Sequence, residues 1–283
     1  MANKVALVTG ASRGVGAAAA IALAEAGYAV ACAARSTKAT PQRTPGTIDD
    51  VVAHIREAGG TAIGVPTDLA DREQVMAMVD TTVAELGRLD VLVNNAAVTF
   101  TGDIDIPQHR HDLVMAIDLD APLVACRHAI PHLRAAGEGR IVNVSSLAAL
   151  RPFPGVMSYG IAKVGLERLT VDLARQLAND NIAVNCFRID VPVASEGFLA
   201  NTPHADHSDW EPSSVAAEGI VWMVGQPVRY SGRRESMHRL AVREGIMASV
   251  AARPGPLPPT DLFDGLFEDG DTVFEEPHAE VAT

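Results

Sequence analysis

The sequence predicts an α/β fold built on a doubly wound parallel sheet in a single domain. Short, wholly apolar runs alternate along the chain with longer runs that favour helix. Strands that are buried on both faces of a parallel sheet read as such apolar runs, and a βαβα alternation is typical of this architecture. A cluster of glycines directly after the first apolar run supports the same fold, because these sheets bind ligands at strand–helix junctions.

Six segments are expected to form strands, since each is short and almost entirely apolar: residues 5–8, 28–34, 61–66, 91–93, 140–144 and 182–187. Five helices are expected between and after them: residues 17–26, 47–58, 71–86, 112–136 and 159–178. Gly27 and Gly87 are suitable terminators, and Asp71 is a suitable N-cap. This order of elements predicts a Rossmann-type sheet.

Two segments stand apart from the alternation. Residues 36–46 are polar, contain Pro41 and Pro45, and are expected to form an enlarged loop. Residues 253–283 begin with a proline-rich stretch and then hold eight acidic residues with no Lys or Arg after Arg253. We therefore expect a domain over residues 1–252, followed by a Pro-rich acidic C-terminal tail that carries most of the net charge of −12.

Composition excludes several classes of function. The net charge of −12 argues against nucleic acid and anionic membranes as partners. Cys32, Cys126 and Cys186 lie far apart in the sequence, so neither a disulfide framework nor a zinc site is expected, and buried free thiols are the favoured reading. The N-terminus shows no signal peptide and no run is long enough to span a bilayer, so we expect a soluble cytoplasmic protein.

The glycine cluster has the form that a dinucleotide site requires. The segment Thr9-Gly10-Ala11-Ser12-Arg13-Gly14-Val15-Gly16 joins the first strand to the first helix. Glycines let the backbone turn tightly and approach a pyrophosphate, and the helix N-terminus offers N–H groups to the anion. Glycines also serve ordinary turns, but the position at this junction favours a cofactor loop.

This spacing resembles the cofactor motif of the short-chain dehydrogenase/reductase family. Further matches follow in the family's order at Asp68, Asn94-Asn95-Ala96-Ala97, Ser146 and Tyr159-x-x-x-Lys163, and they cover about the first 190 residues. The resemblance implies that Asp68 and Leu69 contact the adenine and that Asn95 lines the cofactor cleft. It implies cofactor contacts from the loop at Thr9, Gly10, Ser12, Arg13, Gly14, Val15 and Gly16, together with Tyr159 and Lys163.

Two arginines favour NADP over NAD. An NAD site places an acid at the end of the second strand to hold the ribose 2′-hydroxyl, whereas an NADP site uses Arg. The second strand here ends at Arg35 with no acid, and Arg13 lies within the glycine loop. The alternative is that Arg35 is only a solvated strand end, but NADP is the favoured cofactor. Lys38 and Arg43 in the enlarged loop are better read as surface residues.

Tyr159 and Lys163 have the spacing that general acid–base chemistry would use. Tyrosine has a reference pKa of about 10, and a nearby ammonium lowers that value. The i, i+4 spacing places both side chains on one helix face. The resemblance assigns Tyr159 as the proton donor or acceptor, Lys163 as its tuning partner and ribose ligand, and Ser146 as the ligand of the substrate oxygen. Ser145 is the neighbouring alternative, but the Ser-to-Tyr spacing favours Ser146.

Three departures from the family pattern are apparent. Asp118 stands where relatives carry an Asn of the catalytic proton relay. Ile189-Asp190 replaces Pro-Gly after the sixth strand, and Pro192 removes an N–H that often meets the nicotinamide. Residues 230–237 match only weakly the last strand of relatives, which usually ends in Asp-Gly-Gly. Together with the enlarged loop, these departures make the sequence resemble divergent branches of the family, such as citronellol/citronellal dehydrogenases and hydroxysteroid-dehydrogenase-like proteins.

Other candidate residues favour structural readings. His109 and His111 are expected in a solvated loop and not as metal ligands, and His204 and His207 are expected at the surface, so no metal site is predicted. Phe153, Phe198 and Trp210 flank the expected mouth of the substrate pocket, where they fit core packing equally well.

The resemblance implies an oxidoreductase that moves hydride between NADP(H) and a ketone, aldehyde or alcohol. An epimerase or dehydratase with a retained nicotinamide, and a catalytically weak NADP(H)-binding sensor, remain as alternatives. Relatives are commonly dimers or tetramers, so a homo-oligomer is expected, with a small-molecule carbonyl or alcohol as its substrate.

Overall fold

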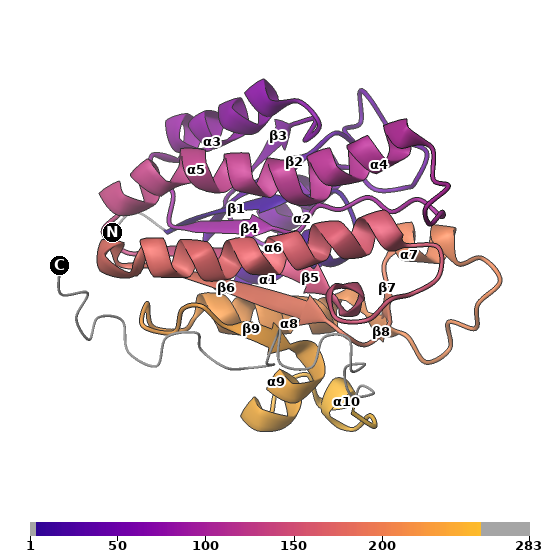
Figure 1. Cartoon of the computed structure of the whole chain (residues 1–283). Coiled ribbons are helices and arrows are strands. Elements are labelled where there is room, and N and C mark those ends of the chain that lie inside the picture. The colour runs from indigo at the N-terminus through magenta and orange to yellow at the C-terminus, as the bar shows by residue number, and fades with distance from the viewer. Residues whose placement is uncertain (1–3, 256–283) are drawn as a thin grey trace.

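A computed structural model describes residues 4–255 of the chain, with the side chain of Asn201 left out, and shows a parallel sheet between two layers of helices (Figure 1). The sheet has seven strands in the order β3-β2-β1-β4-β5-β6-β9, and every pairing in it is parallel. The strands are β1 (Val5–Thr9), β2 (Ala29–Ala34), β3 (Ala62–Pro66), β4 (Val91–Asn94), β5 (Gly139–Ser146), β6 (Ile182–Ile189) and β9 (Arg234–Ser236). This confirms the predicted fold class.

Helices cover both faces of the sheet. One face carries α1 (Gly14–Glu25), α2 (Ile48–Glu57), α8 (Ser213–Val224) and α9 (Met237–Glu244), which share one hydrophobic core. The other carries α3 (Arg72–Leu86), α5 (Ala121–Ala135) and α6 (Met157–Gln176), with α4 (Gln108–Met115) packed on α6. The short helices α7 (Glu196–Asn201) and α10 (Ala248–Ala251), and the two-stranded sheet of β7 (Val193–Ala194) and β8 (Glu211–Pro212), complete the described part.

The apolar runs explain why the sheet is buried on both sides. Side chains alternate across a strand, so Ala6 and Val8 of β1 enter one core while Val5 and Leu7 enter the other. Every residue of β1 and β2 is buried. The cysteines Cys32, Cys126 and Cys186 are likewise buried and unbridged, as predicted.

Two helices begin three or four residues earlier than the sequence predicted, and both differences affect the site. Helix α1 begins at Gly14, so Val15 and Gly16 lie in its first turn. The helix expected over residues 112–136 begins at Gln108, directly after Pro107, and is interrupted by a π-helical turn over Ala116–Asp120. Such turns are rare and often occur at functional sites.

The enlarged loop is present and folds back onto the glycine loop. Arg13 holds it through its guanidinium, which donates to the backbone carbonyls of Thr44, Pro45 and Gly46 over 2.7–2.9 Å. Gly46 has a φ of +104°, and a Cβ there would lie 2.5 Å from the carbonyl oxygen of Ser12. Only glycine therefore fits this close approach.

The predicted acidic tail begins at residue 253, and its residues 256–283 lie outside the described residues. Within residues 4–255, none of the helices combines the length and apolar character that crossing a membrane requires.

Candidate active site

The carboxyl ends of β1 and β4 meet at the centre of the sheet, where the strand order reverses. Open α/β sheets bind their ligands in the crevice at this point. Asn95 joins the two strand ends here, because its side-chain amide donates to the carbonyl of Thr9 over 2.9 Å. The Thr9 hydroxyl in turn accepts the N–H groups of Asn95 and Ala96 at 3.0 and 3.2 Å. Asn95 is half-buried at this point of the sheet.

The glycine loop is shaped for close approach of the backbone. Gly10 and Gly14 adopt φ values of +69° and +56°, which side chains disfavour. A Cβ at Gly16 would lie 2.3 Å from the carbonyl oxygen of Gly10, so this position also requires glycine. Helix α1 begins here with Arg13 at its N-cap and no side-chain cap. The first N–H groups of α1 therefore have no capping side chain, an arrangement that suits a phosphate.

Two arginines border the glycine loop. Burial lowers the pKa of Arg13, the carboxylate of Glu196 raises it, and the charge of Arg35 lowers it, so all three groups are close enough to interact. Arg35 is exposed, whereas Arg13 is half-buried by the loop carbonyls that it binds. Lys38 forms an exposed ion pair with Asp50 at 3.2 Å, which agrees with its reading as a surface residue.

Asp68 and Leu69 follow β3 and lie beside the same crevice. The backbone N–H of Asp68 donates to the side chain of Gln74 over 2.9 Å, and the Asp68 carboxylate accepts the N–H of Ala70. Leu69 lines a small apolar hollow together with Thr9 and Ala96. Both predicted adenine contacts are thus half-buried at the edge of the crevice.

Tyr159, Lys163 and Ser146 converge at the end of β5. Lys163 is buried, and its Nζ donates to the carbonyl of Val144 over 3.1 Å and lies 5.3 Å from the centre of the Tyr159 ring. Burial raises the pKa of Tyr159, the Lys163 ammonium lowers it, Asp118 raises it, and a hydrogen bond with Ser146 lowers it. Ser145 donates to Glu167 over 2.8 Å instead, so Ser146 is the serine at the tyrosine.

Asp118 brings a carboxylate into this cluster. It lies in the π-helical turn and is fully buried, with Oδ1 accepting the N–H of Val98 at 2.8 Å. Oδ2 lies 4.0 Å from Nζ of Lys163 and has no hydrogen-bond partner among the described residues. Burial raises the pKa of Asp118 to about 7, against the lowering effects of Lys163 and of the Val98 bond. The departure from Asn therefore places a proton-binding group beside the lysine.

A buried ion pair supports this cluster and was not anticipated from the sequence. Glu167 lies one helical turn after Lys163 and accepts two hydrogen bonds from Arg188 of β6, at 2.8 and 2.7 Å. Glu167 also accepts the Ser145 hydroxyl, so it connects α6 to the strand that ends in Ser146. The available signal was Arg188, the single charged residue of β6.

The Ile189-Asp190 departure has a structural role. The Asp190 carboxylate accepts the hydroxyl of Ser236 and, at 3.1 Å, the N–H of His238. Asp190 thereby joins the end of β6 to the start of α9. Pro192 is exposed, and its carbonyl accepts the N–H of Glu211 over 2.9 Å.

The loop expected at His109 and His111 is wrong, although His109 is exposed as expected. Both lie in α4, because the helix begins directly after Pro107, and His111 contacts the hydroxyl of Ser158 at 3.0 Å. His207 is half-buried, with its ring 4.3 Å from Trp210, and not simply a surface residue.

Among the three aromatics expected near the pocket mouth, Phe198 and Trp210 stack at 4.6 Å between ring centres, whereas Phe153 is exposed. Phe198 also remains partly exposed, so neither phenylalanine belongs to the core.

The residues present fit a nicotinamide dinucleotide. Gly10 and Gly16 let the loop pack closely against Asn95, where a Cβ would collide, and α1 starts in the same loop without a capping side chain, so its N–H groups suit the phosphates of such a cofactor. Lys163 and Tyr159 lie across the crevice on α6, at the strand ends where the reacting end of such a cofactor would meet a substrate.

Comparison with known proteins agrees with this geometry. A family model described as short chain dehydrogenase matches residues 4–191. The chain is 31% identical over 270 residues to hydroxysteroid dehydrogenase-like protein 2 of Danio rerio, covering 93% of this chain and 64% of that protein, so it spans less than two thirds of the length of this relative.

Two further relatives are similar. The chain is 40% identical over 189 residues to cis-4-hydroxycyclohexanecarboxylate dehydrogenase of Sinomonas cyclohexanicum, covering 65% of this chain and 71% of that protein. A metagenomic short-chain oxidoreductase, solved in complex with NADP, aligns with a TM-score of 0.67 and 29% identity over 81% of this chain and 93% of its own.

Proposed function

Because this chain belongs to the short-chain dehydrogenase family and is an oxidoreductase of that family, we propose that it transfers a hydride from NADPH to a ketone or aldehyde, or from the corresponding alcohol to NADP. Tyr159 acts as the general acid or base in this proposal. The observation that carries the proposal is the convergence of Tyr159, Lys163 and Ser146 at the end of β5. When bound, the nicotinamide supplies or accepts the hydride.

Each residue has a distinct task in this proposal. Ser146 hydrogen-bonds Tyr159 and would orient the substrate oxygen toward the phenol. In the direction of reduction, the Tyr159 hydroxyl gives its proton to the developing alkoxide; in the direction of oxidation, the phenolate takes it. The Lys163 ammonium stabilises the phenolate and is fixed in place by its bond to the carbonyl of Val144.

The NADP preference rests on the basic border of the glycine loop. Arg35 is exposed at the end of β2, where an acid would hold the ribose of NAD, and a guanidinium suits a phosphate because it donates in a fixed fork. Arg13 lies beside it but is engaged by the carbonyls of Thr44, Pro45 and Gly46. Arg35 is therefore the first choice for the 2′-phosphate, and Arg13 shapes the cradle.

Secondary alcohols on a ring are the first substrates to test. The relative named cis-4-hydroxycyclohexanecarboxylate dehydrogenase supports this class. The partly exposed aromatic side chains of Phe153 and Phe198 agree with an apolar substrate body, since they follow β5 and β6 on the side where the tyrosine lies.

The proposal is tested by following NADPH absorbance with a panel of cyclic ketones and aldehydes, and NADP reduction with the matching alcohols. Turnover that depends on Tyr159 supports it. An isotope label on the substrate carbon distinguishes hydride transfer from epimerisation, because an epimerase returns the label without net change in the cofactor.

Asp118 favours one second candidate, a weak catalyst that binds NADP(H) as a sensor. Its carboxylate offsets the Lys163 charge that the tyrosine needs. Tight NADPH binding without turnover on any of the tested carbonyls would favour this candidate.

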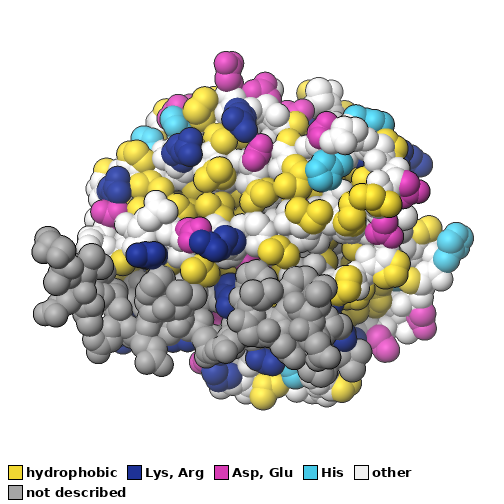
Figure 2. Space-filling model, viewed as in Figure 1, with side chains coloured by type: hydrophobic (Ala, Val, Ile, Leu, Met, Phe, Trp, Pro, Cys, Tyr) yellow, Lys and Arg dark blue, Asp and Glu magenta, His cyan; other side chains and the backbone are white. Residues whose placement is uncertain are grey.

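We also propose that the chain forms a homo-oligomer through the face shown in Figure 2, where hydrophobic side chains gather over α4, α5 and α6. Ile161 of α6 is 47% exposed within this part of the chain. Light scattering of the purified protein measures the assembly, and Ile161→Glu is expected to shift it toward the monomer, because the change places a charge where apolar surface would be buried.

A further inference from the structure

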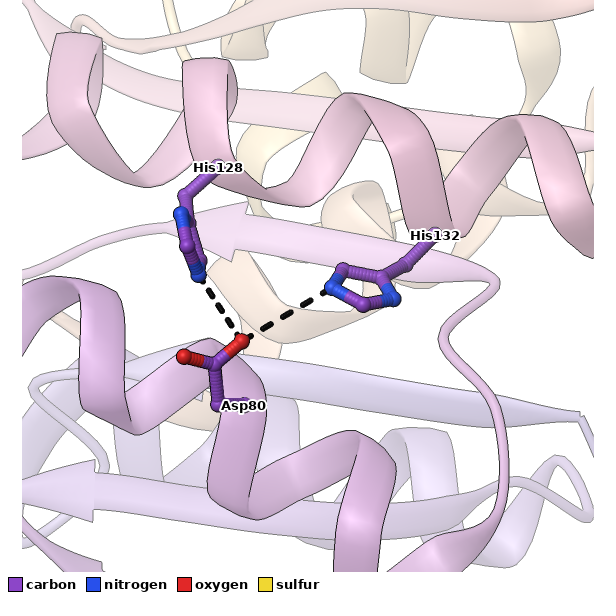
Figure 3. Close-up of side chains that lie close together, drawn as sticks. All are labelled: Asp80, His128 and His132. Carbon is purple, nitrogen blue, oxygen red and sulfur yellow. Dashed lines mark hydrogen bonds and ion pairs between the residues drawn. The ribbon is translucent and has the colours of Figure 1, made fainter.

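We infer that Asp80, His128 and His132 form a binding site for a divalent transition metal, with zinc as its best-suited ion, which links α3 to α5 on the surface of the molecule. The two imidazoles extend from α5 toward the carboxylate on α3, as Figure 3 shows. The site is separate from the crevice described above and does not depend on the proposed function.

The ligand atoms already converge. Nε2 of His128 lies 2.8 Å from Oδ1 of Asp80, and Nε2 of His132 lies 3.8 Å from the same oxygen. One ligand atom from each residue lies within 4.8 Å of the others. Tetrahedral zinc with bonds of about 2.0–2.1 Å places its ligand atoms about 3.4 Å apart, so small side-chain rotations suffice to admit the ion.

The chemistry of the donors suits zinc. Two imidazole nitrogens and one carboxylate oxygen are a donor set that zinc uses with a fourth position left to water, whereas calcium and magnesium favour oxygen ligands alone. Copper(II) and nickel(II) share the preference for imidazole, so the site would take them as well.

The backbone holds the donors in place. His128 and His132 are four residues apart on α5, so they lie on one helix face. Asp80 reaches them from α3, which packs beside α5 on the same side of the sheet. Their side chains are 32%, 32% and 59% exposed, which leaves the site open to an ion from solvent. Among residues 4–255, this is the one group of three such side chains with converging ligand atoms.

The hydrogen bond between His128 and Asp80 gives the cluster a role without a metal, so the test must detect the ion itself. Full-length protein freed of metal with a chelator is titrated with zinc chloride by calorimetry. One equivalent is expected to bind to this site. His128→Ala, His132→Ala and Asp80→Asn are each expected to weaken zinc binding by at least about tenfold. Even the loss of a residue that only hydrogen-bonds to a metal ligand typically lowers metal affinity about 10–100-fold.

Matched controls separate the site from adventitious binding. His54→Ala removes an exposed histidine of α2, and Asp172→Asn removes an exposed acid of α6; both are expected to bind zinc as the parent does. Zinc should also raise the Tm of the parent and of both controls, and at the same zinc concentration it should raise the Tm of Asp80→Asn by less, because an ion held by the folded state stabilises it in proportion to its binding. Unchanged circular dichroism without zinc establishes that each variant is folded.

The outcomes are decisive in either direction. Loss of zinc in all three variants, with both controls unaffected, supports a three-ligand site that spans two helices. Parent-like binding by Asp80→Asn would exclude α3 from the site, and parent-like binding by the histidine variants would place the zinc elsewhere. A parent protein that takes up no zinc would overturn the inference outright.

Discussion

Nζ of Lys163 lies 4.0 Å from Oδ2 of Asp118, and both side chains are buried. The lysine favours the phenolate of Tyr159, whereas the carboxylate disfavours it, so the two residues act on the pKa of the tyrosine in opposite directions.

Asp118→Asn is expected to move the pH profile of alcohol oxidation to lower pH. A charged Asp118 raises the pKa of Tyr159, so removing the charge lowers that pKa, and the phenolate becomes available at lower pH. The rate at neutral pH should be preserved or raised. A pH–rate series on the parent and the variant with one accepted alcohol measures the shift. An unchanged profile, or one that moves to higher pH, would refute this electrostatic role.

The same substitution should change how stability depends on pH. Burial raises the pKa of Asp118 to about 7 in the folded protein, against about 3.9 when unfolded. The folded state therefore binds the proton more tightly, and the parent loses stability as pH rises from about 4 to about 7. Relative to the parent, Asp118→Asn should gain up to about 4 kcal/mol across this window. Urea unfolding of both proteins at pH 4.5, 6 and 7.5 gives the difference, which would stay constant if the carboxyl did not titrate.

Tyr159→Phe is expected to lower kcat by at least about 100-fold, because general acid–base catalysis is typically worth that much. NADPH affinity should change little, since the phenyl ring beside Lys163 is kept. Steady-state kinetics and a fluorescence titration with NADPH measure the two effects separately. Activity within about tenfold of the parent would remove Tyr159 from its proposed role.

Arg35→Asp is expected to shift the cofactor preference from NADP toward NAD. The change replaces a phosphate donor by the acid that NAD sites use for the ribose hydroxyls. Dissociation constants for NADPH and NADH, measured on the parent and the variant, report the ratio. Lys38→Asp is the matched control, because Lys38 pairs with Asp50 and should leave the ratio unchanged. Equal ratios for parent and Arg35→Asp would mean that Arg35 does not reach the cofactor.

Glu167→Gln is expected to destabilise the fold by about 3–5 kcal/mol, because it removes the buried carboxylate charge that accepts two hydrogen bonds from the guanidinium of Arg188. Denaturant unfolding at neutral pH measures the loss. Arg168→Ala, which removes an exposed charge from the next position of α6, should cost less than about 1 kcal/mol. Similar values for the two variants would contradict the supporting role of the buried pair.

Much of the fold follows from local patterns in the sequence. The six expected strands are all present because continuous apolar runs of that length are stable only between two helix layers. The boundaries of helices were less predictable. Helix α1 begins at Gly14 and α4 at Gln108, since glycine in a first turn and a helix that starts after proline carry weak sequence signals.

The candidate catalytic residues were predictable where their pattern is local in the sequence. Tyr159 and Lys163 are one helical turn apart, so their spacing alone predicts that they share one helix face. The glycine loop is continuous in the sequence, so it is recognised without knowledge of the fold. The Ser-to-Tyr spacing favoured Ser146 over Ser145, and the structure adds the physical reason, because Ser145 is engaged by Glu167. The hydrogen bonds from Arg13 to the carbonyls of the enlarged loop could be seen only in the structure, because the two segments are far apart in the sequence.

The sequence by itself determined the doubly wound sheet, the dinucleotide loop and the tyrosine–lysine pair, because each depends on residues a few positions apart. Tertiary structure alone decided that Asp118 faces Lys163, that Arg188 meets Glu167 and that Asp80 meets two histidines of α5. In the last of these contacts, Asp80 and His128 are 48 positions apart and lie on different helices. Their meeting depends on how α3 and α5 pack on the sheet, and no periodicity within either helix encodes that packing.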